Sequence, residues 1–377
     1  MSSFRKRVGL IVNPIAGMGG RVGLKGSDGE ETLSRARELG ATPSAPGRAL
    51  RTLMGLGPLI NEIELITFPG EMGETEAREA GFEPRVIGSI QIGRTTAKDT
   101  MRAGEEMFAL AVDLLLFAGG DGTARDIYQA VGLRIPVVGI PAGVKIHSGV
   151  YAINPAGAAS LAMMYLRGQV GILGELEVMD IDEIAFRQGQ VSTQLYGYLK
   201  VPLERRFTQG VKAASVTGNH EILAMQSIAE QIVETMDADC LYIIGSGTTP
   251  RAIMERLGLK NTLLGIDGVL NGKLVALDLN ETQLLELIEE KKAKIIITPI
   301  GGQGYIFGRG NQQLSPDVIK KAGTENVIIV ATRNKINSLE RRPLLLDTGD
   351  KEVDKMLTGY VKVVTGYREE MVCKISY

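Results

Sequence analysis

The chain has 377 residues, of which 44% are hydrophobic and 23% charged, and its formal net charge is −2. This length favours two domains with sizeable cores, and the ordinary, nearly balanced composition argues against a nucleic-acid-binding or membrane-docking surface. The 47 glycines cluster in short motifs rather than in low-complexity runs, as in proteins with several glycine-rich ligand loops.

Cysteine and histidine are too sparse for a zinc framework. Cys240 and Cys373 stand far apart and outside any CxxC pattern, and there are only two histidines. We therefore expect reduced thiols in the cytoplasm. The basic N-terminus is followed by too few apolar residues for a signal peptide. The longest apolar run, residues 108–118, is interrupted by Asp113 and is too short to span a membrane.

The first predicted strand, residues 8–12, ends in a glycine-rich loop over residues 13–20. Open α/β sheets bind ligands at this end of their strands. After Gly17 and Gly19, a dinucleotide-binding fingerprint needs a third glycine where this chain has Val22, and no Gly-Lys-Ser/Thr of a Walker A loop occurs. The loop is therefore well placed for a ligand but lacks both of these phosphate motifs.

The next hundred residues alternate between helical and extended patterns. Helices are predicted over residues 31–39, 45–54 and from 96 to about 112, and strands over 62–67 and 84–87.

A buried strand over residues 114–118 then runs into the turn Gly119-Gly120-Asp121-Gly122, and a helix is predicted over residues 123–130. The backbone N–H groups of a glycine turn are uncovered, and a helix N-terminus adds unpaired donors and a favourable dipole, so the turn suits a phosphate. Asp121 would repel that phosphate unless it holds a metal ion or accepts a proton. The alternative is a tight turn with glycines at positive φ and Asp as a turn former.

A strand over residues 135–140 leads into the loop 141–148 and a helix through residue 166. Repeated strand–helix units with short loops predict a doubly wound parallel sheet for this half of the chain. Lys145 and His147 are candidate substrate contacts because loops at strand ends often carry function; a plain loop role is the alternative.

From about residue 168 the pattern changes to short, alternating segments, which predict antiparallel strands and a second domain. We place the domains at 1–168 and 169–377, with a last segment that could return to the first domain. Strands are predicted over 178–186, 190–199, 212–217, 240–244, 263–266, 273–277, 295–297, 327–331 and 344–346, and helices over 219–236, from Pro250, and over 281–292.

Three motifs in order carry a resemblance to a known family. Gly119–Thr123 resembles the GGDGT signature of the NAD kinase, diacylglycerol kinase and sphingosine kinase superfamily, and 6-phosphofructokinases carry a related turn. Asn13-Pro14-x-x-Gly17 resembles the NPxxG element of the lipid-kinase branch. Residues 139–143 occupy the place of another strand-end loop of these kinases, which begins Pro-x-Gly.

Segments 25–29, 139–148 and 298–313 resemble the prokaryotic ATP-NAD kinase-like group, which includes proteins named for acetoin catabolism. The resemblance implies an NAD kinase-like α/β fold, with an N-terminal doubly wound parallel sheet and a second, strand-rich α/β domain. Thr298-Pro299-x-Gly301 is similar to the start of the TPTGSTAY element of NAD kinases. The Asn-Glu pair with which NAD kinases bind the adenine-ribose group has no clear match in this chain, so the identity of the phosphoryl acceptor stays open.

The resemblance further implies a kinase that transfers a phosphoryl group from ATP or polyphosphate to a hydroxyl, most directly the 2′-hydroxyl of NAD, to give NADP. Mg²⁺ or another divalent cation would bridge the phosphates, with no protein ligands assigned, and Asp121 would be the base. The implied nucleotide and phosphate contacts are Asn13, Gly17, Gly119, Gly120, Gly122, Thr123, Pro141 and Gly143.

Other candidate substrate contacts lie in the second half of the chain, each with a structural alternative. Gly245, Ser246, Gly247 and Thr248 follow a strand and could bind a second phosphate or simply start a helix, and Arg309 stands within a glycine-rich run as an anion contact. Two other functions remain open: a kinase for a lipid or sugar, and a nucleotide-binding regulator without turnover. We expect small-molecule partners in the cytoplasm, no nucleic acid and no membrane, and the sequence is compatible with a homo-oligomer.

Overall fold

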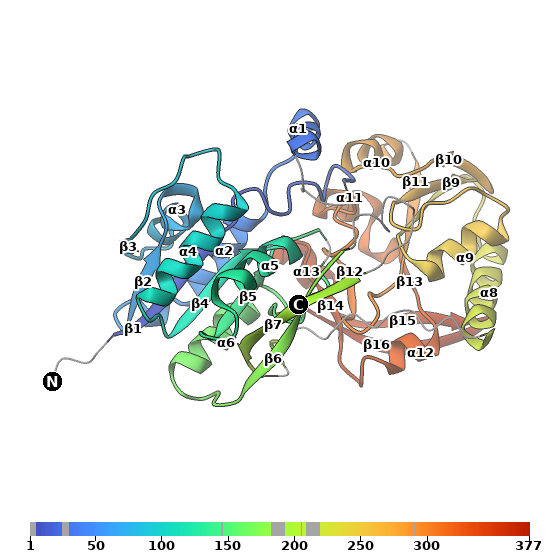
Figure 1. Ribbon diagram of the computed structural model, residues 1–377. Coiled ribbons are helices and arrows are strands. Elements are labelled where there is room, and N and C mark those ends of the chain that lie inside the picture. Colours follow the sequence, from blue (N-terminus) through green and yellow to red (C-terminus); the bar gives the residue numbers. More distant parts are fainter. Residues whose placement is uncertain are drawn as a thin grey trace. The chain divides into compact units, whose positions relative to one another are not determined.

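The computed structural model describes residues 5–24, 30–144, 146–181, 193–204, 206–208, 219–289 and 291–377. The chain divides into two compact units. Unit 1 comprises Met1–Met18 and Thr42–Val211, and unit 2 comprises Gly19–Ala41 and Lys212–Tyr377. Each unit has its own central sheet (Figure 1). Within the described residues, no helix is both long and apolar enough to cross a bilayer.

Unit 1 contains a five-stranded parallel sheet in the order β3-β2-β1-β4-β5. Its strands are β1 Lys6–Val12, β2 Ile63–Thr67, β3 Arg85–Val86, β4 Leu114–Gly119 and β5 Val137–Pro141. The helical segments are α2 Ala45–Gly55, η1 Gly57–Leu59, η2 Gly70–Met72, α3 Glu74–Glu79, α4 Ala97–Ala109, α5 Asp121–Val131 and α6 Pro155–Leu166.

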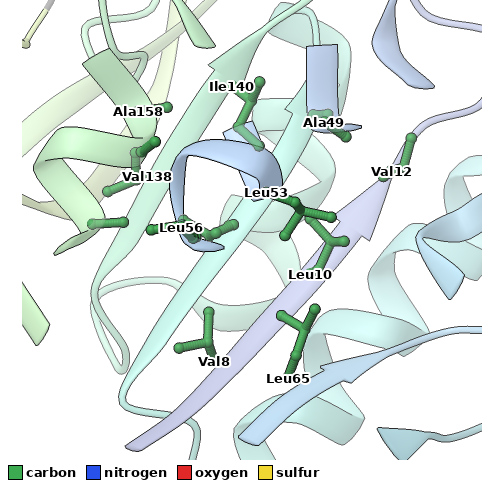
Figure 2. Close-up of a cluster of buried hydrophobic side chains, with 14 of the residues drawn as sticks. Val8, Leu10, Val12, Ala49, Leu53, Leu56, Leu65, Val138, Ile140 and Ala158 are labelled. Atoms are coloured by element: carbon green, nitrogen blue, oxygen red, sulfur yellow. The ribbon is translucent and has the colours of Figure 1, made fainter. Parts of the chain in front are cut away.

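Strands β4 and β5 and the C-terminal part of β1 are fully buried, and their alternate side chains enter separate cores. Leu10 of β1 and Leu116 of β4 pack with α2 and α6 in one core, which Figure 2 shows around Leu53. Ile11 and Phe117, one residue further along each strand, pack with α4 and α5 in the other core. A strand with helices on both faces needs apolar residues at every position, so this arrangement confirms the predicted doubly wound fold.

An antiparallel hairpin of β6 (Leu173–Ile181) and β7 (Thr193–Pro202) also belongs to unit 1. The domain boundary proposed after residue 168 assigned it to the second domain. Val178, Leu199 and Val201 are buried in the core on the α4–α5 face, which explains why the hairpin clusters with the first unit. Residues 19–41 and 212–377 belong to unit 2.

Unit 2 contains a mixed nine-stranded sheet in the order β10-β9-β8-β11-β13-β15-β16-β14-β12. Its strands are β8 Cys240–Ile244, β9 Asp267–Leu270, β10 Lys273–Ala276, β11 Lys292–Ile297, β12 Tyr305–Phe307, β13 Val327–Val330, β14 Leu344–Leu346, β15 Gly359–Gly366 and β16 Glu369–Ser376. Its helical segments are α1 Glu30–Glu38, α8 Asn219–Glu234, α9 Thr248–Arg256, α10 Glu281–Ile288, α11 Pro316–Ala322, η3 Thr324–Asn326, α12 Arg333–Asn337 and α13 Lys351–Leu357. This confirms the predicted strand-rich α/β second half.

Several predicted elements of this half were wrong. No strand forms over residues 263–266, because the Asp267 carboxylate accepts hydrogen bonds from the backbone N–H and hydroxyl of Thr262, both at 2.7 Å, and so holds a turn. Helix α10 ends at Ile288, four residues early, because β11 begins at Lys292. Strands β12, β15 and β16 were not predicted. The strand predicted over 212–217 lies outside the described residues.

Candidate active site

The strand–glycine–helix turn forms as the sequence indicates. Strand β4 ends at Gly119, Gly120 is the N-cap residue, and the eleven-residue helix α5 begins at Asp121, two residues earlier than predicted. No side chain caps this helix, so its N-terminus carries the partial positive charge and the backbone donors that suit an anion.

Three strand-end loops of unit 1 meet at this turn. The Asn13 backbone N–H donates to Ala118 at 2.9 Å, and its side-chain amide donates to the Thr123 hydroxyl at 2.9 Å. From the other side, the backbone N–H groups of Ala142 and Gly143 donate to the Gly119 carbonyl at 2.9 and 3.1 Å. Strands β1, β4 and β5 are parallel neighbours, so their carboxyl ends share one edge of the sheet, where α/β proteins bind ligands.

Glycine is needed in these loops because they approach one another closely. Gly17 has φ +79°, and a Cβ there would lie 2.0 Å from the Ser44 hydroxyl oxygen and 2.2 Å from the Ala142 carbonyl oxygen. A Cβ on Gly120 would lie 3.1 Å from the Cα of Gly143. The motif glycines of all three loops therefore serve their mutual packing, whatever ligand contacts they also make.

Asp121 is 5% exposed, and both of its carboxylate oxygens are bonded to the loop after β5. Oδ2 accepts the backbone N–H of His147 at 2.7 Å and lies 3.1 Å from the Nδ1 of its ring. Oδ1 accepts the backbone N–H and the hydroxyl of Ser148 at 3.1 and 2.7 Å. The structure thus joins the predicted catalytic aspartate to His147, a predicted substrate residue.

Ser148 and Tyr151 complete this arrangement, and the sequence analysis missed both. The fully buried Ser148 hydroxyl accepts the backbone N–H of Met179 on β6 at 3.0 Å, and the Tyr151 hydroxyl donates to the Gly120 carbonyl. The available signal was their position in or just after the same strand-end loop as His147. Lys145, predicted in that loop, lies outside the described residues.

Among the remaining predicted contacts, Pro141 and Gly122 also lie at this edge. Pro141, the last residue of β5, is paired with Gly119, and its carbonyl accepts the buried Arg48 guanidinium at 2.9 Å. Gly122 is in the first turn of α5. All the residues predicted to contact nucleotide or phosphate therefore belong to the same group of loops in unit 1; the contacts themselves stay predictions.

The other predicted contacts belong to unit 2. Gly245, Ser246 and Gly247 connect β8 to α9, which begins at Thr248. Helix α12 contributes Lys335, which the sequence analysis did not single out: its ammonium nitrogen lies 3.1 Å from the Thr298 hydroxyl and 3.4 Å from that of Thr249.

Arg309 has a structural environment of its own in unit 2. It is 4% exposed, its Nε lies 3.5 Å from the equally buried carboxylate of Asp347, and its guanidinium stacks 4.3 Å from the centre of the Tyr305 ring. Removal of either partner of such a buried ion pair is destabilising, because the other charge is left buried and uncompensated. Its expected role as an anion contact stays a prediction.

The fold and the turn together define a class of protein, the α/β proteins with a GGDGT-type turn at the carboxyl edge of a doubly wound sheet. The family model of the ATP-NAD kinase N-terminal domain matches residues 8–170, and that of the ATP-NAD kinase C-terminal domain matches residues 238–375. The chain belongs to the ATP-NAD kinase family. The two matches leave residues 171–237 unassigned, so the exact domain boundary stays a prediction.

Solved structures add little to this assignment. A diacylglycerol kinase from Bacillus anthracis str. Sterne is 19% identical over 48% of this chain and 45% of its own, with a TM-score of 0.23. A protein provisionally described as a UDP-N-acetylglucosamine 2-epimerase from Listeria monocytogenes is 13% identical over 93% of this chain and 76% of its own, with a TM-score of 0.26. The chain thus spans less than half of the diacylglycerol kinase. No curated protein matches it.

Proposed function

We propose that this protein transfers a phosphoryl group from ATP or polyphosphate to the 2′-hydroxyl of NAD and so makes NADP. The observation that carries the proposal is the GGDGT-type turn at the meeting point of three strand-end loops, in a chain that matches both ATP-NAD kinase domain models.

The chemistry of the turn supports phosphoryl transfer, which depends on positioning the phosphates and neutralising their charge. The start of α5 offers backbone donors and a positive dipole end to a phosphate. Among the described residues, no three His, Cys, Asp or Glu side chains are placed to hold a metal ion. Mg²⁺ would supply charge neutralisation when bound, and in phosphoryl-transfer sites it usually needs only one or two carboxylates besides the phosphates of the substrate.

An assay for NADP tests the proposal directly. The purified full-length chain is incubated with Mg²⁺, NAD and either ATP or polyphosphate, and NADP is read through an NADP-specific dehydrogenase. We expect NADP to form with at least one donor and in proportion to the protein. Tight nucleotide binding without any NADP would favour a regulator without turnover, and phosphorylation of a lipid or sugar instead of NAD would favour a different acceptor.

Asp121 should be needed for turnover rather than for nucleotide binding. Asp121→Asn is expected to lower kcat by about 10²-fold or more while the Kd for the nucleotide changes by no more than a few-fold. Asp113→Asn is a matched control, because Asp113 lies on the surface of the same unit in an ion pair with Lys6 at 3.4 Å. If Asp121→Asn turns over like the wild type, Asp121 has no part in the mechanism.

A further inference from the structure

We propose that Ser148 is a positioning residue for phosphoryl transfer, whose hydroxyl orients the carboxylate of Asp121. The hydroxyl proton has two acceptors, the Asp121 carboxylate and the Met179 carbonyl, and it moves from the first to the second when Asp121 takes up a proton. This role deepens the proposed kinase function and rests on it, with Asp121 as the base that the family resemblance implies.

The burial of Ser148 shows that it acts through another residue. Ser148 is 0% exposed and therefore offers no surface to a substrate. Its side chain is bonded to Asp121 of the glycine turn and to Met179 of β6. Asp121 carries the only ionisable group of these two partners, so an effect of the Ser148 hydroxyl on the reaction has to pass through that carboxylate.

The distances around the Ser148 hydroxyl define the two acceptors. Its Oγ lies 2.7 Å from Oδ1 of Asp121 and 2.8 Å from the carbonyl oxygen of Met179. A hydroxyl has one proton, so it donates to one of these oxygens at a time. Hydrogen bonds to ionised groups are the stronger ones. While Asp121 is ionised, the proton therefore points to Oδ1.

The hydroxyl is fixed in place by its other contacts with β6. The backbone N–H of Met179 donates to the Ser148 Oγ at 3.0 Å, and the backbone N–H of Gly149 donates to the Glu177 carbonyl at 2.9 Å. Strand β6 is in turn paired with β7 along its length. The orientation of the Asp121 carboxylate is thus set by β6 as well as by helix α5, as the positioning of a reacting group requires.

In the proposed step, the O–H bond of the acceptor hydroxyl breaks and its proton binds the carboxylate of Asp121. The freed oxygen forms a bond to the transferred phosphorus, while the bond from phosphorus to the donor's bridging oxygen breaks and its electron pair stays on the departing phosphate. Asp121 is then neutral and a weaker acceptor, so the Ser148 hydroxyl turns to the Met179 carbonyl. Release of the proton from Asp121 to water restores the first arrangement.

The second acceptor matters because the hydroxyl is buried. A buried donor that loses its acceptor carries the full cost of its lost hydration. With the Met179 carbonyl 2.8 Å away, the Ser148 proton has an acceptor in both protonation states of Asp121. Proton uptake by Asp121 therefore leaves this donor satisfied, and the barrier to the step is lower than it would be with a single acceptor.

The test uses the full-length protein with Ser148→Ala, which removes the hydroxyl but keeps the backbone N–H that donates to Oδ1 of Asp121 at 3.1 Å. We expect kcat to fall by about 10–100-fold, as for the loss of one hydrogen bond to a charged group. The KM for NAD and the Kd for ATP should stay within about twofold, because the orientation of the base matters in the transition state.

Thr52→Val is the matched control for the loss of a buried hydroxyl. Thr52 is also 0% exposed and in unit 1, and its hydroxyl oxygen lies 3.0 Å from the Arg48 carbonyl oxygen and 3.2 Å from that of Pro155. Thr52→Val should lower the melting temperature by as much as Ser148→Ala does or more, with kcat unchanged. If Ser148→Ala does not fold, Ser148→Cys replaces it, since a thiol is only a weak donor, and the same loss of kcat is expected.

A double variant separates positioning from a general structural role. Added to Asp121→Asn, Ser148→Ala should lower kcat further by less than about twofold, since residues that act through one another are not additive. A further loss as large as in the wild-type background would overturn the inference. So would a Ser148→Ala variant with wild-type kcat, or one whose loss lies in the Kd for ATP.

A measurement without turnover distinguishes this inference from the proposed function, against which a wild type that makes no NADP would count. The protein is labelled with ¹³C at the side-chain carboxyl carbon of aspartate, and the Asp121 resonance is assigned by its loss in Asp121→Asn. That resonance should shift in Ser148→Ala and stay in place in Thr52→Val. An unchanged resonance in Ser148→Ala would contradict the inference whatever the activity.

Discussion

Glu76, on α3, is a carboxylic acid whose burial lowers the stability of the folded protein. It is 5% exposed, and its Oε2 has no hydrogen-bond partner among the described residues. Burial raises the pKa of this carboxyl above its ordinary 4.5, more than a backbone hydrogen bond lowers it, and the nearby charges of Glu79 and Glu71 add to the increase. The charged form is therefore disfavoured in the folded protein.

The pH dependence of this effect has a definite sign. Between pH 4.5 and the raised folded-state pKa, the folded protein binds more protons at Glu76 than the unfolded chain does, so the contribution of Glu76 to stability falls as pH rises. Glu76→Gln removes this pH-dependent loss of stability. The free energy of unfolding of this variant relative to the wild type should therefore increase between pH 4.5 and pH 8, as measured by urea denaturation.

The exposed Glu83, four residues beyond the end of this helix, is the control for this substitution, since it does not contribute to the raised pKa of Glu76. Glu83→Gln should change the free energy of unfolding by no more than a few tenths of a kcal/mol across the same range, since exposed charges contribute little. A Glu76→Gln difference that does not vary with pH would contradict the assignment of the raised pKa.

At the scale of elements, the parts of the site that are contiguous in the chain could be predicted from the sequence, and the contacts between distant parts could not. The turn at Gly119 to Thr123 is predictable because a buried strand, glycines and a helix follow one another directly. The bonds of Asp121 to His147 and Ser148 join residues 26 and 27 positions apart, and they exist only because β4 and β5 pair in parallel and bring their loops together.

The strands that the sequence analysis missed have a different physical cause. Strands β15 and β16 form an antiparallel hairpin in which polar residues alternate with apolar ones, and one face is exposed: Tyr360 is 79% and Val372 is 68% exposed. Strand β8, which is fully buried, appears as a continuous apolar run and was predicted, whereas the fully buried β12 has only three residues and gives no such run. A half-exposed hairpin gives a weaker apolar signal, and tertiary pairing decides whether it forms.

At the scale of the whole molecule, the chain passes between its two compact units three times, after residues 18, 41 and 211. The family matches cover both halves of the chain. A domain boundary after residue 168, as the sequence analysis predicts, would separate the β6–β7 hairpin from the core in which it is buried. Fold topology alone therefore does not show at which residue a stable fragment of unit 1 can end. The buried side chains of the hairpin show that such a fragment has to include β6 and β7.

Two fragments test this boundary. Residues 1–211 keep the hairpin, whereas residues 1–168 lose the buried Val178, Leu199 and Val201 and expose the apolar side chains packed against them. Burial of each such side chain contributes about 1.5–3 kcal/mol, a large share of the stability of a domain of this size. We expect cooperative thermal unfolding and a near-ultraviolet circular dichroism signal from 1–211, and loss of both from 1–168. Equal stability of the two fragments would show that the hairpin is dispensable and that the core of unit 1 closes without it.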